Sequence, residues 1–282
     1  MPTTTTGRAA VPTRVRGVAA SLNRIGAVMS NTLREAGRNR IFYGLVVLAG
    51  VMILGSLLLS DLALVDQKAR LVQDFGLFVI PLLTVLTSVI LGVVLLQKEI
   101  EQKTLYAILP KPVRRSEFLL GKFLGLCALL AIEVAVLALC WFAVLTLRGG
   151  EVTQPLLIAL ALSYVEVVVV TSIATFFSAL SSPILSGVLT TGLFVVGRVA
   201  YVLTDLLGAK KGIFVEVPAM RSLGQTLVAV VPDLSTFNVA DELLLGWTVP
   251  SSYVVSALGY GLSWVTLFLL LGVLVFERRD LT

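Results

Sequence analysis

Six long apolar runs alternate with shorter polar segments along the chain. The runs are residues 41–60, 76–96, 118–147, 156–180, 183–207 and 253–276. A helix needs about 20 apolar residues to cross the roughly 30 Å hydrocarbon core of a bilayer, and every run reaches that length. The pattern therefore predicts an all-α integral membrane protein with six transmembrane helices.

An amphipathic segment, residues 21–38, precedes the first run. Its apolar residues recur at helical spacing at Leu22, Ile25, Val28, Met29, Leu33 and Ala36. Ser21 is a residue type that caps helix N-termini. A basic amphipathic helix beside a span is typical of an interfacial helix on the lipid headgroups, and packing on a partner protein is the alternative. Residues 1–20, rich in Thr, Pro and Arg, are expected to form a flexible cytoplasmic tail.

Two connections in the second half of the chain carry structural signals. Only Ser181 and Ser182 separate the fourth run from Pro183, which suits the first turn of a helix, so a tight helical hairpin is expected. The segment 208–252 places apolar residues at helical spacing between two prolines. This pattern predicts one or two short extracytoplasmic helices that enter the outer leaflet or cap the bundle.

Composition and charge support a membrane protein and orient it. Only 14% of residues are charged, against about 25% in soluble domains. Fifteen of the 22 Lys and Arg residues lie in the N-terminal segment, in the segment 98–122 and at the C-terminus, six lie on the opposite side, and Arg198 lies within a run. Because cytoplasmic segments carry the excess of Lys and Arg, both termini and segment 97–117 are expected in the cytoplasm.

Residue usage narrows the possible chemistry. The chain has no histidine, which excludes His-dependent catalytic triads and removes the commonest metal ligand. Its two cysteines, Cys127 and Cys140, lie in one apolar run, where small apolar packing is the expected role and neither a disulfide nor a metal site is indicated.

Segment 97–117 is a dense charged interruption between the second and third runs. Residues 98–109 can form a short helix with apolar contacts at Ile100, Leu105, Ile108 and Leu109. Pro110 and Pro112 then stop the helix and force an extended turn. The segment has the form of a docking element, and the alternative is a charged loop that only fixes topology.

The stretch from the end of the second run into the third carries, in order, Glu99, Glu101, Thr104, Leu105, Pro112, Val113, Arg114, Gly121 and Lys122. This pattern resembles the cytoplasmic loop of ABC-2 type transporter permeases. Lys103 and Pro110 depart from the family pattern, and either could change the local turn. The wider plan of an interfacial helix, six spans, a tight hairpin and a helical outside segment matches over residues 21–282.

The resemblance implies a mechanism and partners. A separate cytoplasmic ATPase, present in two copies, would bind ATP and Mg, while segment 97–117 docks on it as a coupling loop. Glu99, Glu101, Thr104, Leu105, Pro112, Arg114 and Arg115 are the candidates for transmitting ATPase motion. The sequence has no G-x-x-x-x-G-K-[ST] phosphate loop, so the chain is not expected to be the enzyme itself. A second permease chain, identical or homologous, and a bacterial inner-membrane location are further implications.

Three charged residues lie near the middles of predicted spans: Glu133, Glu166 and Arg198. Each would cost several kcal/mol facing lipid, so all three are expected to face the bundle interior. Two acids and one base predict one ion pair, with the second Glu neutral or paired across a dimer. A polar substrate path or switch is one interpretation, and a structural clamp is the other. The outside loop 61–74 is expected to be a solvated charged face rather than a cation site.

Three functions remain open from the sequence. The first is a permease that moves a hydrophobic, amphipathic or envelope-related substrate, with membrane lipid around it and no nucleic acid involved. The second is a mechanical coupler that passes ATPase motion to an extracytoplasmic partner. The third is an ion-coupled secondary transporter using Glu133 and Glu166, against which the lack of an internal repeat and the docking-like loop argue.

Overall fold

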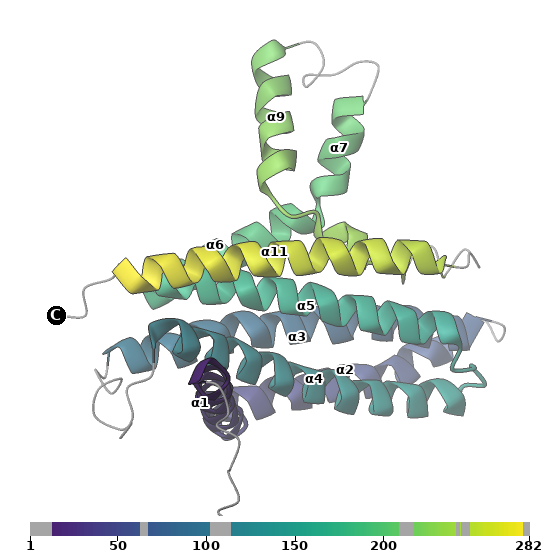
Figure 1. Ribbon diagram of the computed structural model, residues 1–282. Helices are drawn as coiled ribbons and strands as arrows, with labels where there is room; N and C mark the ends of the chain where they lie inside the picture. Colours follow the sequence, from purple (N-terminus) through teal and green to yellow (C-terminus); the bar gives the residue numbers. More distant parts are fainter. Residues whose placement is uncertain are drawn as a thin grey trace, which may run out of the picture.

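The computed structural model describes residues 13–62, 67–101, 114–208, 217–240, 243 and 249–278, which form a bundle of helices (Figure 1). The elements are α1 (Thr13–Ala36), α2 (Arg40–Leu62), α3 (Lys68–Glu101), α4 (Arg115–Leu147), α5 (Gln154–Leu180), α6 (Pro183–Arg198), α7 (Ala200–Gly208), α9 (Pro218–Val230), the 3-10 helix η3 (Leu234–Phe237) and α11 (Ser251–Arg278). Within these ranges, α2, α3, α4, α5 and α11 are long and apolar enough to cross a membrane, and the bent pair α6–α7 makes a sixth if it counts as one span. The predicted all-α membrane fold is confirmed.

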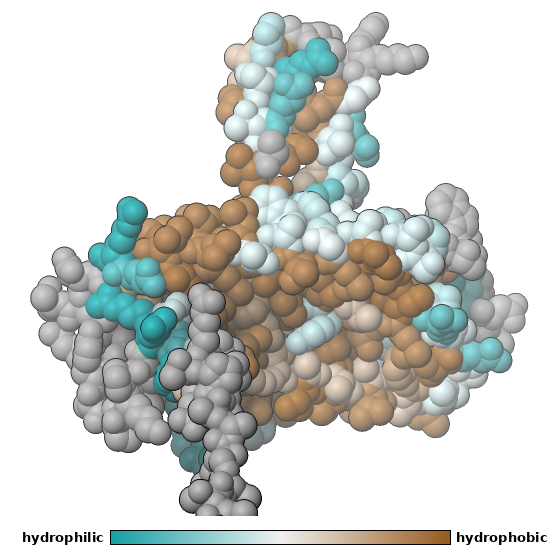
Figure 2. All heavy atoms as spheres, in the orientation of Figure 1, coloured by the Kyte–Doolittle hydropathy of each residue, from teal (hydrophilic) through white to brown (hydrophobic). Residues whose placement is uncertain are grey.

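Helix α3 is the centre of the bundle, because it packs against α2, α4, α5 and α6. Of the most apolar stretch of α3, 72% is buried within the chain, against 22% for α2 and for α11. The outer faces of α2 and α11 therefore present apolar side chains outward. Figure 2 shows hydrophobic residues over the flank of the bundle and hydrophilic residues at its two ends, which is the distribution that a surrounding bilayer requires.

Helix α1 crosses the spans near one end of the bundle and is seen almost end-on in Figure 1, where the spans run across the view. We call the end that holds α1, the start of α4 and the end of α11 the α1 end, and the opposite one the far end. Helix α1 begins at Thr13, eight residues earlier than predicted, so the expected flexible tail is wrong for residues 13–20. No proline follows Pro12 in this stretch, and most of its residues tolerate a helix. Ser21 therefore lies inside the helix and does not cap it.

Helix α3 also extends beyond its predicted end. It continues from the span through Lys98 to Glu101, so the separate short helix expected to begin at residue 98 does not start there. Four of the residues 97–101 are good helix formers, the fifth is Ile100, and none is Gly or Pro, which allows the span to continue without a break. Residues 102–113 lie outside the described part of the chain.

The fifth predicted span, residues 183–207, is not one straight helix. Helices α6 and α7 meet at Val199 at an angle of 44°. A Cβ at Gly197 would stand 2.6 Å from the carbonyl oxygen of Pro232 and 3.0 Å from the Leu234 side chain, so only glycine allows this close approach. The segment entering η3 therefore packs directly against the end of α6, where the chain changes direction.

Helices α7 and α9 lie side by side and stand out from the bundle (Figure 1). We call this pair the arm. Helix α9 confirms the helix predicted between the two prolines. Two hydrogen bonds hold the segment that follows the arm to α11. The backbone N–H of Asp233 donates to the hydroxyl of Tyr260 at 2.7 Å, and the hydroxyl of Tyr253 donates to the carbonyl oxygen of Thr236 at 2.8 Å.

Candidate functional site

Two glycines of α4 allow α1 to cross it closely. A Cβ at Gly121 would stand 2.6 Å from the Cβ of Val28, and one at Gly125 would stand 2.6 Å from the Cβ of Thr32. Because they are four residues apart, the two glycines lie on one face of α4 and form a flat surface against which α1 packs. The sequence of α4 thus fixes where the crossing occurs.

Glu117 binds both α1 and the first turn of α4. Its carboxylate accepts hydrogen bonds from Arg24 Nε at 2.7 Å, from Arg24 Nη2 at 2.6 Å and from the hydroxyl of Ser21. The backbone N–H of Arg114 donates to the same carboxylate at 3.2 Å, which satisfies a donor at the helix start. The Glu117 side chain is only 6% exposed. Hydrogen bonding to Glu117 raises the pKa of the Arg24 guanidinium.

Further contacts join α4 to α1 and α11 at the same end. Lys122 Nζ lies 3.2 Å from the carboxylate of Glu35 on α1, and Lys122 is buried. Arg115 Nη1 donates to the carbonyl oxygens of Phe276 at 3.1 Å and Glu277 at 3.2 Å, in the last turn of α11. Cations bind the free carbonyls of helix C-termini favourably. We call the contacts that Arg114, Arg115, Glu117 and Lys122 make at this end the α1-end junction.

Within the spans, Glu166 of α5 forms an ion pair with Arg198 at the end of α6. Arg198 Nη1 lies 2.5 Å from one oxygen of the carboxylate and 2.6 Å from the other. Glu166 is 1% exposed, whereas the Arg198 side chain is 30% exposed. This is the ion pair expected among the three intramembrane charges. It holds the end of α6 to α5 next to the bend at Val199.

Glu133 of α4 has a different environment. Its Oε1 lies 2.9 Å from the hydroxyl of Thr87 on α3, and the residue is 1% exposed. Its Oε2 is buried, and no group in the described part of the chain forms a hydrogen bond with it. A carboxylate in such a position would be a costly buried charge.

Comparison with protein families matches residues 26–281 to the ABC-2 family transporter proteins. The match covers nearly all of the chain. The chain belongs to this family. No curated protein matches the chain. As an ABC-2 family member, the chain is a permease subunit, the transmembrane part of an ABC transporter, and is not itself the ATPase.

In this ABC-2 permease, the structure describes only some of the residues predicted to transmit motion. The backbones of Glu99 and Glu101 belong to the last turns of α3. Thr104, Leu105 and Pro112 lie outside the described residues. Arg114 and Arg115 lie at the start of α4, and both contribute to the α1-end junction.

Sequence reasoning missed Glu117, Arg24 and Glu35. A signal for Glu117 existed, because an acid three residues after a helix start, before an apolar run, has capping-box spacing. Arg24 lies in the amphipathic segment 21–38, but the pattern of that segment does not indicate which residue it meets. Nothing in the sequence indicates that Glu35 meets Lys122, since that pairing depends on the crossing of α1 over α4.

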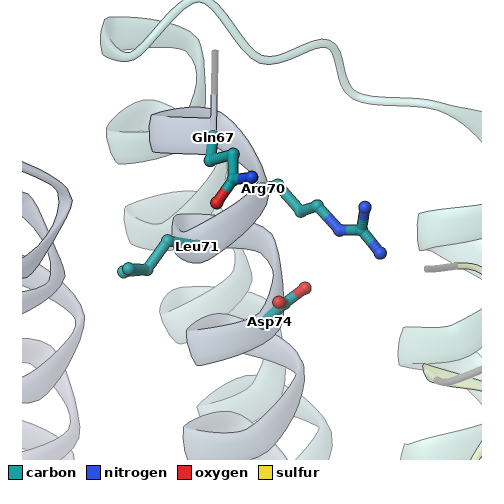
Figure 3. A pocket seen from close by; sticks show the side chains of 4 residues that line it. All are labelled: Gln67, Arg70, Leu71 and Asp74. Atoms are coloured by element: carbon teal, nitrogen blue, oxygen red, sulfur yellow. The ribbon is translucent and has the colours of Figure 1, made fainter. Parts of the chain in front are cut away.

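The far end of the permease holds a cavity of about 290 Å³ (Figure 3). It is lined by Gln67, Arg70, Leu71 and Asp74. All four come from one short stretch at the start of α3. Among the described residues, no three His, Cys, Asp or Glu side chains lie together so that they could hold a metal ion. Nearby, Asp61 forms ion pairs with Arg148 at 2.8 Å and Lys68 at 3.3 Å, as a solvated charged face would.

Proposed function

We propose that this permease moves a hydrophobic, amphipathic or envelope-related substrate across or onto the bacterial inner membrane, using ATP hydrolysed by a separate cytoplasmic ATPase. Membership of the ABC-2 family supports the role of transmembrane subunit. The observation that carries the proposal is the α1-end junction. Arg114, Arg115 and Glu117 form the C-terminal end of segment 97–117, which is expected to dock on the ATPase. Arg114 donates its backbone N–H to Glu117, Glu117 binds Arg24 of α1, and Arg115 binds the last turn of α11.

The junction offers a mechanical route for ATPase motion. A displacement of the docking segment reaches Arg114 first, because Arg114 caps α4. Glu117 passes the displacement to α1 through Arg24, and Arg115 passes it to the end of α11. On the other side of the segment, α3 is one continuous helix from Glu101 into the centre of the bundle. The docking segment thus acts on the central helix and on two peripheral ones at once.

The partners follow from the same proposal. ATP and Mg would be bound by the ATPase, in two copies, and two permease chains would form the membrane part as a homodimer or a heterodimer. The excess of Lys and Arg at the α1 end supports a cytoplasmic location for that end and for both termini. The far end then faces the extracytoplasmic side, while the arm projects from the flank of the bundle, across the direction of the spans (Figure 1).

The arm favours a second candidate function, a mechanical coupler. It stands clear of the bundle and joins it through α6 and η3, beside the bend at Val199. Exposed apolar side chains at Met220, Leu223, Leu227 and Val230 follow one side of α9. Such a surface could pass motion to an extracytoplasmic partner. Transport of a defined lipid or amphiphile into vesicles distinguishes the two functions, because a pure coupler moves no substrate.

Substitution at the docking segment tests the proposal. We would reconstitute the permease with its ATPase and compare wild type with the double variant Glu101→Ala/Arg114→Ala. We expect transport, or motion of the arm for a coupler, to fall at least tenfold per ATP hydrolysed while the spans keep their thermal stability. Arg34→Ala is the control, since Arg34 is exposed on α1. If the double variant stays coupled, this route is wrong. Activity of the chain alone in liposomes, driven by an ion gradient, would reject the ATPase-driven function.

A further inference from the structure

The hydroxyl of Thr87 has more acceptors than it can serve. Its Oγ1 lies 2.9 Å from the carbonyl oxygen of Leu83 and 2.9 Å from Oε1 of Glu133. A hydroxyl carries one hydrogen and can donate only one full hydrogen bond, but it can also accept. Both contacts are satisfied if Thr87 donates to Leu83 and Glu133 donates to Thr87. A carboxylate has no hydrogen to donate, so this arrangement requires the protonated acid.

The other oxygen of Glu133 agrees with this assignment. Oε2 is buried and forms no hydrogen bond with any described residue. The carbonyl oxygen of a neutral acid tolerates such a position far better than a carboxylate oxygen does. Arg198, a cation within a span, is engaged by Glu166 through both carboxylate oxygens.

The titratable groups on the elements around Glu133 offer no counter-charge in the described contacts. Helix α3 has none between Phe75 and Leu96, and α2 has only Tyr43 between Arg40 and Asp61. On α5, the hydroxyl of Tyr164 donates to the carbonyl oxygen of Cys127 on α4. The remaining titratable residues on these elements within the bundle are Cys127 and Cys140 of α4, Glu166 of α5, and Tyr253 and Tyr260 of α11. The nearest junction charge on α4 is Lys122, which is paired with Glu35 and lies eleven residues, or about 16 Å, along α4 from Glu133.

We propose that Glu133 is a proton-binding site in the centre of the permease. While α3 and α4 are packed together, the acid holds its proton and donates to Thr87. When the two helices part and water enters, the O–H bond of the acid breaks, its electron pair stays on the carboxylate and the proton passes to water as hydronium. Proton occupancy and the packing of α3 on α4 are then linked, and each biases the other.

The position of this contact connects it to the working cycle. The Glu133–Thr87 hydrogen bond joins α3 and α4, the two helices that flank the docking segment. This half of the inference rests on the proposed function, because ATPase motion at that segment is what would part the helices. The protonated resting state does not rest on it, since it is argued from the contacts of Thr87 and the burial of Glu133 Oε2.

Infrared difference spectroscopy of the purified permease in lipid tests the resting state. Wild type minus Glu133→Gln should show the carbonyl stretch of a protonated carboxylic acid at neutral pH. Glu166→Gln is the matched control, which should show carboxylate bands instead, because Glu166 is paired with Arg198. Thr87→Val should shift the acid band to higher frequency, as expected when its hydrogen-bond acceptor is removed. A folded Glu133→Gln variant with no acid band in the difference overturns the proposal. If Glu133→Gln does not fold, an acid band that keeps its wild-type frequency in Thr87→Val overturns the proposal instead.

The same measurement on the complex tests proton release. With the ATPase bound and trapped by ATP and vanadate, the Glu133 acid band should lose at least half its intensity. A constant band in a complex that hydrolyses ATP rejects release and leaves the proposed function standing. If this permease neither binds an ATPase nor changes the rate at which one hydrolyses ATP, the proposed function is rejected. The acid band of the permease alone still decides whether Glu133 is a proton-binding site.

Discussion

Glu117 joins the start of a membrane span to a helix that crosses it. Its carboxylate accepts hydrogen bonds from two nitrogens of Arg24. Such a bidentate Arg–carboxylate pair fixes the geometry of the contact as well as stabilising it. The surrounding hydroxyl of Ser21 and backbone N–H of Arg114 use the remaining acceptor positions. Such a satisfied carboxylate is rigid, which is the property a transmitting contact needs.

Removing the partner of Glu117 should loosen this end of the molecule. We expect Arg24→Ala to lower the melting temperature in detergent by several degrees, because it leaves a nearly buried carboxylate unpaired. Arg34→Ala on the same helix removes an equal charge from an exposed position and should change the melting temperature little. Equal effects of the two substitutions would show that the Glu117 contact contributes nothing specific.

The Glu166–Arg198 pair gives a second prediction at this scale. Arg198→Ala should destabilise the fold by about 3 kcal/mol or more, because Glu166 is left as a buried charge without its counter-ion. The double variant Glu166→Leu/Arg198→Leu should recover most of that loss, since apolar replacement of both partners is often close to neutral. Unfolding in denaturant monitors both variants. No recovery in the double variant would mean that the pair has a role beyond charge compensation.

The crossing of α1 over α4 is the main feature at the scale of elements. It depends on Gly121 and Gly125, where any side chain would meet α1. Gly125 is the stricter position, because an added Cβ would also stand 2.8 Å from the backbone carbonyl oxygen of Met29, which cannot rotate away. Helix α1 can therefore sit close enough for its charged side chains to reach Glu117 and Lys122.

Adding one methyl group at Gly125 should push α1 away from α4. We expect Gly125→Ala to cost about 1–3 kcal/mol of stability, as overpacking does, and to weaken coupling to the ATPase. Gly26→Ala is the matched control within α1, because nothing lies within 4 Å of a Cβ there. The control should be neutral or slightly stabilising, since Ala favours helix over Gly. Thermal unfolding of the two variants decides, and equal melting temperatures would contradict the close crossing.

The elements also show what the sequence can predict. Apolar runs of sufficient length predicted α2, α3, α4, α5 and α11, because lipid demands length and hydrophobicity that are visible in the sequence. The bend between α6 and α7 was missed, since it depends on the carbonyl oxygen of Pro232 approaching Gly197 from a distant segment. The ion pair of Lys122 with Glu35 was missed for the same reason. Contacts between segments far apart in sequence follow from packing, which residue patterns in one segment do not encode.

At the scale of the whole molecule, the α1 end gathers everything that the ATPase would act on. The start of α4 and the last turn of α11 meet there through Arg115, and α1 crosses beside them. The turn between α4 and α5, which includes Gly149 and Glu151, lies at the far end. The α1 end, which would receive the motion of the ATPase, and the far end therefore lie one span length apart.

This arrangement predicts a topology that thiol labelling can measure. Single cysteines would be introduced as Glu151→Cys, Arg38→Cys and Glu277→Cys in a chain with Cys127 and Cys140 replaced by Ala. A membrane-impermeant thiol reagent should label the first variant in intact cells, and the other two only after permeabilisation. Labelling of Arg38→Cys in intact cells would reverse the proposed orientation.

If a separate ATPase drives this permease through the α1-end junction, ATP hydrolysis and transport by the permease affinity-purified from its native membrane will show it. We expect an ATPase subunit to co-purify with vanadate-sensitive hydrolysis. We also expect Arg115→Ala/Glu117→Ala to retain the ATPase but to lose at least tenfold in transport per ATP. A permease that purifies without any ATPase and moves substrate on an ion gradient alone would rule out this mechanism.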